Sequence, residues 1–115
     1  MLEDWQKLAA REIPIPLSDV PAEQRIAGAP KTGAVQIEKS GATVIGVWEM
    51  TPGVMRDIEA DEILTVISGA ATVEFQDGGK ITLEPGAVAR LHAGQHTVWT
   101  VTETLRKVYV LLPPR

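Results

Sequence analysis

Two carboxylates and two histidines are the residues of this chain whose types suit acid–base or metal chemistry. Asp57 and Glu62 lie five positions apart, and His92 and His96 lie four apart around a turn that contains Gly94. Carboxylates bind hard divalent cations, whereas iron, nickel and zinc favour sites with imidazole ligands. Two carboxylates that face one cavity also repel each other, which raises the pKa of one of them and suits it to proton transfer. The four residues are therefore candidate ligands for a divalent metal (Mn, Zn, Ni or Fe), although their spacing alone implies no cofactor.

Nucleophilic and redox chemistry find no support in the sequence. The chain has no cysteine, which excludes disulfides, thiolate nucleophiles and thiolate metal sites. Ser18, Ser40 and Ser68 lie at turn or arm positions, and no nucleophile-elbow, phosphate-loop or dinucleotide glycine pattern occurs. The carboxylates keep a plainer interpretation as well, because acidic side chains in loops are mostly solvated and Arg56 or Lys107 could pair with them.

Two tryptophans are placed to form the walls of a pocket. On a strand, Thr97 and Trp99 point to one side because side chains alternate between the two faces. If these side chains and that of Trp48 face inward, two indoles line a cavity, with Met55 and Tyr109 beside them. Aromatic walls with a few polar groups are typical of small-molecule pockets. Tryptophan inside a small barrel is also common as plain core, so both interpretations stay open.

Composition limits the class of protein. The chain has 115 residues, 44% of them hydrophobic and 23% charged, which fits one globular domain. Its net charge is −4 with no basic run, so we expect neither nucleic-acid nor membrane-surface binding. The charged N-terminus has no apolar run of signal-peptide length, and no other segment could span a bilayer. We therefore expect a cytoplasmic protein.

Residues 1–33 are predicted to form a helix and an arm ahead of the main domain. Apolar residues recur at helical spacing over residues 2–12, which predicts a short amphipathic helix; they are Leu2, Trp5, Leu8 and Ala9. Pro14 and Pro16 end this helix, because proline lacks the N–H donor that a helix needs. The arm that follows is rich in proline and alanine, and its residues 21–25 could form one helical turn.

From residue 34 to residue 115 the pattern predicts an all-β barrel. Turn signals such as Asp77-Gly78-Gly79 and Glu84-Pro85-Gly86 separate short runs rich in Val, Ile, Thr and Leu. Several short strands at such spacing are typical of a β-sandwich or barrel. No helix is available to cover the sheets, so the strands must bury their apolar sides against one another. The expected strands are 34–38, 43–50, 63–67, 70–76, 80–83, 87–91, 96–101 and 106–112.

The order of these turn residues resembles that of the cupin family, whose members fold as double-stranded β-helix, or jelly-roll, barrels. The first cupin motif ends with a glutamate, six further residues and a glycine, which correspond to Glu62 and Gly69 here. Pro85-Gly86 and Gly94 then resemble the second cupin motif. The run Trp48-Glu49-Met50-Thr51-Pro52-Gly53 resembles the opening of the branch related to (S)-ureidoglycine aminohydrolase, the DUF861 type. Asp61-Glu62, Thr97-Val98-Trp99 and Arg106-Lys107-Val108-Tyr109 are similar to that branch too. The resemblance covers roughly residues 40–112 and implies the barrel fold.

Most metal-ligand positions of the family are replaced in this chain. The resemblance places Met55 and Asp57 at the two histidines of the first motif and Thr97 at the histidine of the second, so only Glu62 is kept. His92 stands where the family has proline, and His96 stands one residue early. A shift of one residue in a strand reverses the direction of the side chain. We therefore expect His92 at a strand end and His96 on the outer surface.

Three functions follow from these observations. The first is binding of a small polar organic molecule, with Asp57 and Glu62 for polar contacts and Trp48 and Trp99 as walls. The second, implied by the resemblance, is a metal-assisted hydrolase or isomerase acting on a ureido-type small nitrogen compound. The third is a metal-free barrel that serves as a dimeric partner of another protein. The resemblance also implies a homodimer, in which the helix and arm could cover a sheet edge.

Overall fold

The computed structural model describes residues 2–3 and 6–114, which form nine strands and no helix. The strands are β1 (Ser18–Asp19), β2 (Arg25–Ala27), β3 (Lys31–Ser40), β4 (Thr43–Met50), β5 (Gly53–Ile58), β6 (Glu62–Phe75), β7 (Lys80–Leu83), β8 (Val88–Leu91) and β9 (His96–Leu111). All of their pairings are antiparallel. The predicted all-β fold is confirmed, and no helix in the described residues is long and apolar enough to cross a membrane.

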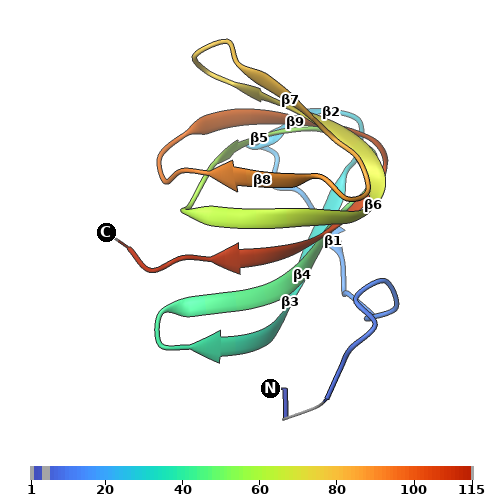
Figure 1. Ribbon diagram of the computed structural model, residues 1–115. Helices are drawn as coiled ribbons and strands as arrows, with labels where there is room; N and C mark the ends of the chain where they lie inside the picture. The colour runs from blue at the N-terminus through green and yellow to red at the C-terminus, as the bar shows by residue number, and fades with distance from the viewer. Residues whose placement is uncertain (1, 4–5, 115) are drawn as a thin grey trace.

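Two long strands, β6 and β9, curl the sheet into a barrel (Figure 1). They pair with each other over nearly their whole length. The first half of β9 also pairs with β5 and its second half with β4, while β6 pairs with β8 and then with β7. The strand order along the other path is β1-β3-β4-β9-β5-β2. Each long strand therefore belongs to both halves of the barrel, and its inward residues line one continuous interior.

The core lies between these two halves. Its fully buried side chains include Met50 on β4, Leu64 and Val73 on β6, and Trp99 and Leu105 on β9. Alternate residues of the long strands supply it, as expected for strands with one buried face. Each such side chain contributes about 1.5–3 kcal/mol by leaving water. This packed core supports the residues of the inner cavity described below.

The bend in β6 explains why the sequence predicted two strands where there is one. Gly69 has a backbone φ of +92°, and a Cβ placed there would lie 2.1 Å from the carbonyl oxygen of Thr104. The register between β6 and β9 shifts on both sides of this glycine. Such bulges bend a strand without ending it. The prediction also missed β5 (Gly53–Ile58), because the expected strands left out every residue from 51 to 62.

The predicted N-terminal helix is wrong for the described residues. Residues 6–9 have no regular structure and residues 10–12 form a turn. The local hydrogen bonds, from Gln6 N to Glu3 O and from Glu12 N to Ala9 O, span three residues rather than four. Trp5, one of the four residues behind the prediction, lies outside the described residues. A helix of this length is marginal in water unless its apolar side is packed.

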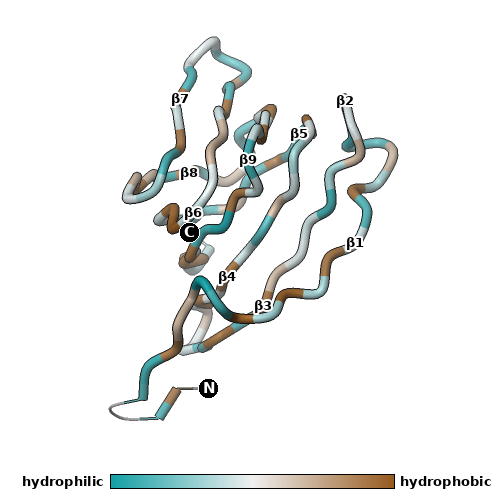
Figure 2. The backbone as a smooth tube through the Cα atoms, turned by 90° about the vertical axis from the view of Figure 1, so that its right-hand side faces the viewer, coloured by the Kyte–Doolittle hydropathy of each residue, from teal (hydrophilic) through white to brown (hydrophobic). Residues whose placement is uncertain are grey.

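The arm is held against the outer face of the barrel by Arg106 on β9. The Arg106 guanidinium donates hydrogen bonds to the carbonyl oxygens of Ala10 (2.9 Å) and Ile13 (2.8 Å). Further along, a Cβ on Gly33 would lie 2.1 Å from the carbonyl oxygen of Pro16, so only glycine permits this close approach. Figure 2 shows the arm passing beside β3 towards β1 and β2. The arm then adds β1 to the edge of β3 and β2 to the edge of β5.

Candidate functional site

A cavity of about 250 Å³ lies among residues of β3, β4, β5, β6 and β9 and of the loop that joins β5 to β6. Two indoles, one phenol, three carboxylates and one ammonium line it. The lining residues are Ala34, Trp48, Asp57, Glu59, Glu62, Trp99, Lys107, Tyr109 and Leu111. Apolar walls with a few converging polar groups are typical of small-molecule sites, so this cavity is the candidate functional site.

Lys107 and Glu62 form a buried ion pair in this cavity. Lys107 Nζ lies 2.6 Å from Glu62 Oε2, and their side chains are only 6% and 9% exposed. The same Nζ lies 4.6 Å from the ring centroid of Trp48 and 4.8 Å from that of Trp99. Both distances are within the range of cation–π attraction. The ammonium therefore holds one carboxylate and two indoles in a fixed arrangement.

Glu59 is held by neutral hydrogen-bond donors instead of a cation. Its Oε2 accepts hydrogen bonds from the Thr97 hydroxyl (2.6 Å) and from Trp99 Nε1 (2.9 Å). Glu59 is 8% exposed and Thr97 is 3% exposed. Hydrogen bonds to a carboxylate partly replace the water that it loses on burial. Because Trp99 also packs against Trp48, with ring centroids 5.5 Å apart, Glu59 helps to fix the aromatic wall.

Of the three carboxylates in the cavity, Asp57 has the fewest partners to compensate for its loss of water. Burial raises its pKa above 3.8, and the nearby charges of Glu59 and Glu62 raise it further. A hydrogen bond from the backbone N–H of Ile58 and the charge of Lys107 act in the opposite direction and are outweighed. Burial, and after it the charge of Glu62, raises the pKa of Tyr109 above 10.0. The cavity thus combines three negative groups whose mutual repulsion is only partly relieved.

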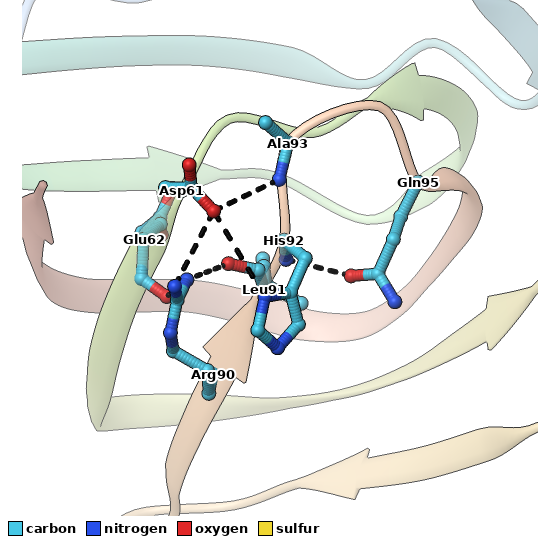
Figure 3. Close-up of polar contacts among 7 residues, drawn as sticks. All are labelled: Asp61, Glu62, Arg90, Leu91, His92, Ala93 and Gln95. Carbon is cyan, nitrogen blue, oxygen red and sulfur yellow. Dashed lines mark hydrogen bonds and ion pairs between the residues drawn. The ribbon is translucent and has the colours of Figure 1, made fainter. Parts of the chain in front are cut away.

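The loop that carries Glu59 is fixed by the loop between β8 and β9. Asp61 accepts hydrogen bonds from Arg90 Nη2 (3.3 Å) and from the backbone N–H of Ala93 (3.2 Å), as Figure 3 shows. The backbone of Glu59 bonds to the same loop twice, accepting from Gly94 N and donating to Gln95 O, each at 2.9 Å. These contacts hold the end of β5 and the start of β6 at the distance that brings the carboxylates together.

Five of the seven residues predicted to line a pocket do so together. They are Trp48, Asp57, Glu62, Trp99 and Tyr109. Met55 lies beside them in the buried core, 5% exposed, and Thr97 lies behind Glu59 as its hydrogen-bond donor.

The two histidines lie outside the cavity. The His92 side chain is 52% exposed, with Nδ1 3.9 Å from Asp61 Oδ1 (Figure 3). His96 is exposed and lines an outer groove of about 660 Å³. That groove also contains Ile58 and Arg56, and Arg56 already donates to the carbonyl oxygen of Glu23. The groove brings together no buried charged side chains, so it is a weaker candidate than the inner cavity.

Sequence reasoning missed Glu59 as a site residue, and it named Lys107 only as a possible partner of the carboxylates and not as part of the pocket lining. The structure shows that Lys107 does pair, with Glu62, and that it does so inside the cavity. Glu59 lies in a loop, where no strand alternation predicts the direction of a side chain. Lys107 could have been found, because it has the same odd parity on β9 as Thr97 and Trp99. Val101 and Leu105 of the same parity are also buried, so this side of β9 faces inward on both sides of the exposed bend at residues 102–104.

The donor set does not fit the divalent metal that the cupin resemblance implies. Met55 offers a thioether in the core, and the Thr97 hydroxyl is bonded to Glu59. A metal on Glu62 Oε2, at about 2.1 Å, would lie within about 4.7 Å of Lys107 Nζ. Charges of +2 and +1 at that distance repel by about 7 kcal/mol at an effective dielectric constant of about 20. Among the residues described, no group of three or more His, Asp or Glu side chains has a metal-binding arrangement.

Comparison with known proteins shows which families and solved structures this chain is similar to. Residues 37–109 match the EutQ-like cupin domain family. The EutQ protein of Clostridium difficile is 23% identical, with a TM-score of 0.65 over 73% of this chain and 69% of that one. A DUF861-family protein of unknown function from Pseudomonas syringae is 22% identical, with a TM-score of 0.76 over 89% of this chain and 46% of that one. This chain thus spans less than half of the Pseudomonas protein.

A putative ethanolamine utilization protein Q from Salmonella typhimurium is 15% identical, with a TM-score of 0.64 over 90% of this chain and 99% of that one. No curated protein matches this chain. At these identities the solved structures establish a shared fold.

Proposed function

This chain belongs to the EutQ-like cupin domain family, and on that premise we propose that its inner cavity binds a small polar organic molecule rich in N–H donors. Amines, amides and ureido compounds belong to this class. The observation that carries the proposal is the imbalance of charge in the lining, which has three carboxylates and one cation. A ligand that brings N–H groups, or a positive charge, supplies what the lining lacks.

The acceptors in the cavity outnumber its available donors. Lys107 is committed to Glu62 and to the two indoles. In the described part of the chain, neither Asp57 nor Glu59 forms an ion pair. Trp48 and Trp99 provide flat apolar faces on which a planar amide or ureido group can stack. A ligand whose only polar groups are acceptors would instead add a further negative or unpaired group to the cavity.

A ureido compound suits this cavity well, and we propose the placement near (S)-ureidoglycine aminohydrolase as its finer form. The run from Trp48 to Gly53 supports that placement, since it resembles the opening of that branch. A ureido group is planar and small, and it presents several N–H donors on one side. It therefore matches both the aromatic walls and the excess of acceptors.

Acid–base catalysis on the same ligand is a second candidate function. Asp57, whose pKa is raised by burial and by its acidic neighbours, could donate a proton to a leaving nitrogen. The carboxylate of Glu59 lies in the same cavity and could accept one. This candidate uses residues of the chain alone. It predicts turnover of a ureido compound that depends on Asp57 and persists in the presence of a chelator.

A homodimer that serves as a structural partner is the third proposal. Its support is apolar exposure on β6 and β8, where Ile63 is 38% exposed and Val88 is 68% exposed. Apolar side chains on a sheet face can mark a contact surface. This proposal concerns the outside of the barrel and is compatible with ligand binding inside it.

A thermal-shift panel of matched small molecules tests the binding proposal. The N–H-rich probes are methylurea, acetamide and ethylammonium, and the acceptor-only probes of similar size are acetate and propionate. A ligand at about ten times its Kd raises the melting temperature of a domain this size by roughly 5 °C. We expect such a shift with at least one N–H-rich probe and none with the acids.

The Asp57→Asn variant links the shift to the cavity. It should stay folded and show a smaller ligand-induced shift than wild type, because the lining carboxylate that has no ion pair among the described residues has lost its charge. Asp77→Asn is the matched control, since Asp77 is exposed and lies outside the cavity. A larger shift with acetate than with acetamide would refute the proposed ligand class. No shift with any probe, together with a dimeric mass by analytical ultracentrifugation, would favour the structural proposal.

A further inference from the structure

The one cation in the cavity stands beside the one metal-ligand residue that this chain shares with the cupin motifs. Glu62 is that residue, and its Oε2 lies 2.6 Å from Lys107 Nζ. At the other motif positions, Met55 and Thr97 are poor ligands for iron, nickel or zinc, and Asp57 offers a carboxylate in place of an imidazole. The chain has therefore lost the imidazoles and holds a positive charge at the carboxylate that remains.

The ammonium of Lys107 is fully engaged by the protein. An ammonium has three N–H donors. Here one is directed to Glu62, and the rings of Trp48 and Trp99 lie 4.6 and 4.8 Å away and can take the other two. The side chain is only 6% exposed. These are the features of a fixed structural cation and not of a solvated lysine.

The strands place Lys107 at this point firmly. On β9 it lies opposite Trp48 of β4 on one side and opposite Val66 of β6 on the other. Its neighbour Arg106 points to the outer face and is bonded there to Glu49 and to the arm. Because neighbouring side chains of a strand point to opposite faces, the contacts of Arg106 also hold Lys107 towards the interior.

We propose that Lys107 is the resident cation of this barrel and takes the place of a divalent metal. It neutralises Glu62, orients both indoles and needs no loading step. A second cation at Glu62 is opposed by charge repulsion from the ammonium 2.6 Å away. This inference does not depend on the ligand proposed above, because it concerns the cavity before any ligand binds.

Wild-type protein provides the first test. In ¹⁵N-labelled protein the Lys107 ammonium should give an NMR signal that survives at neutral pH, because burial slows its exchange with water, and ring currents should shift it upfield. One equivalent of Mn²⁺ should leave the indole N–H signal of Trp99 unbroadened, and dialysis against EDTA should leave the melting temperature unchanged. Selective broadening of that indole signal by Mn²⁺, or a loss of several degrees after EDTA treatment, would overturn the proposal.

Chemical rescue of Lys107→Ala provides the second test. The variant should lose on the order of 10 °C in melting temperature, because Glu62 is left buried and unpaired. n-Propylammonium replaces the atoms removed and should restore about half of that loss, whereas n-propanol of the same length should restore little. Lys39→Ala, at an exposed lysine, should respond to neither compound.

The two compounds separate a cation from simple packing. Equal rescue by n-propanol would mean that Lys107 only fills space, and absence of rescue by n-propylammonium in a folded variant would also refute the proposal. If Lys107→Ala does not fold, the wild-type NMR and Mn²⁺ measurements decide the question on their own.

Discussion

Replacing Arg106 by methionine should release the N-terminal arm from the barrel. The Arg106 side chain is 11% exposed, and its Nε and Nη2 both lie 2.9 Å from Glu49 Oε1. Its Nη1 donates to the carbonyl oxygens of Ala10 and Ile13 at 2.9 and 2.8 Å. Methionine keeps much of the apolar length of the side chain and removes all of these bonds. The change therefore tests the polar clamp with little loss of packing.

The expected cost follows from the partners that are left behind. Glu49, with its side chain 17% exposed, loses its only ion pair among the described residues. Removing one partner of a buried pair typically costs 3–5 kcal/mol. Because the two carbonyl groups can turn to water once the arm detaches, we take the lower end, about 3 kcal/mol. In a domain of this size that corresponds to a loss of roughly 12 °C in melting temperature.

Urea unfolding and limited trypsin digestion measure the two effects separately. Arg11 lies between the two carbonyl groups that Arg106 holds, so cleavage after Arg11 should become faster in Arg106→Met under native conditions. Arg90→Met is the matched control, because among the described residues the Arg90 side chain bonds to Glu62, Leu91 and Asp61 and not to the arm. Unchanged stability together with unchanged cleavage after Arg11 would refute the clamp. If cleavage after Arg11 became equally faster in both variants, the cause would be global unfolding and not release of the arm.

Two further substitutions test the backbone and the cavity. Gly69→Val should prevent folding or lower the free energy of unfolding by more than about 3 kcal/mol, because Gly69 has a φ of +92° and a Cβ there would meet the Thr104 carbonyl. Wild-type stability of this variant, measured by circular dichroism, would contradict the bend. Asp57→Asn should stabilise the protein at pH 7, because the raised pKa means that ionised Asp57 opposes folding. The favourable contribution of Asp57 is complete below pH 3.8 and is lost as pH rises through its folded pKa, so the gain should vanish in acid. Asp77→Asn, at an exposed aspartate that also accepts one backbone N–H at 2.8 Å, is the matched control for these urea-unfolding measurements.

The fold could be predicted where local chemistry determines it. The Asp77-Gly78-Gly79 turn gave the hairpin of β6 and β7, and β4 and β7 have the predicted bounds. The long strands could not be predicted whole, because Gly69 resembles a turn residue until its bulge against β9 is seen. The helix failed for a similar reason. Its spacing was helical, but the arm is held by bonds from Arg106, which lies some ninety residues away in the chain.

The candidate site was predictable to the extent that strand alternation and the cupin motifs determine it. Trp48, Trp99 and Tyr109 line the cavity because their strands place alternate residues inward. The partnership of Lys107 with Glu62 joins β9 to β6 across 45 positions, and no local pattern encodes it. Glu59 depends on a loop whose position is set by the backbone of the β8–β9 loop. Contacts between distant segments therefore decided what the local patterns left open.

The three carboxylates of the cavity are stabilised in three different ways, and this difference indicates where a ligand would bind. Glu62 has an ion pair with Lys107, and Glu59 has hydrogen bonds from Thr97 and Trp99. Asp57 has one backbone hydrogen bond, from Ile58, and a raised pKa. A donor group therefore gains most at Asp57, where its charge or N–H replaces missing solvation, and least at Glu62, where it would have to displace the ammonium. The asymmetry predicts that the proposed N–H-rich ligand binds with its donors towards Asp57 and its flat face along the two indoles.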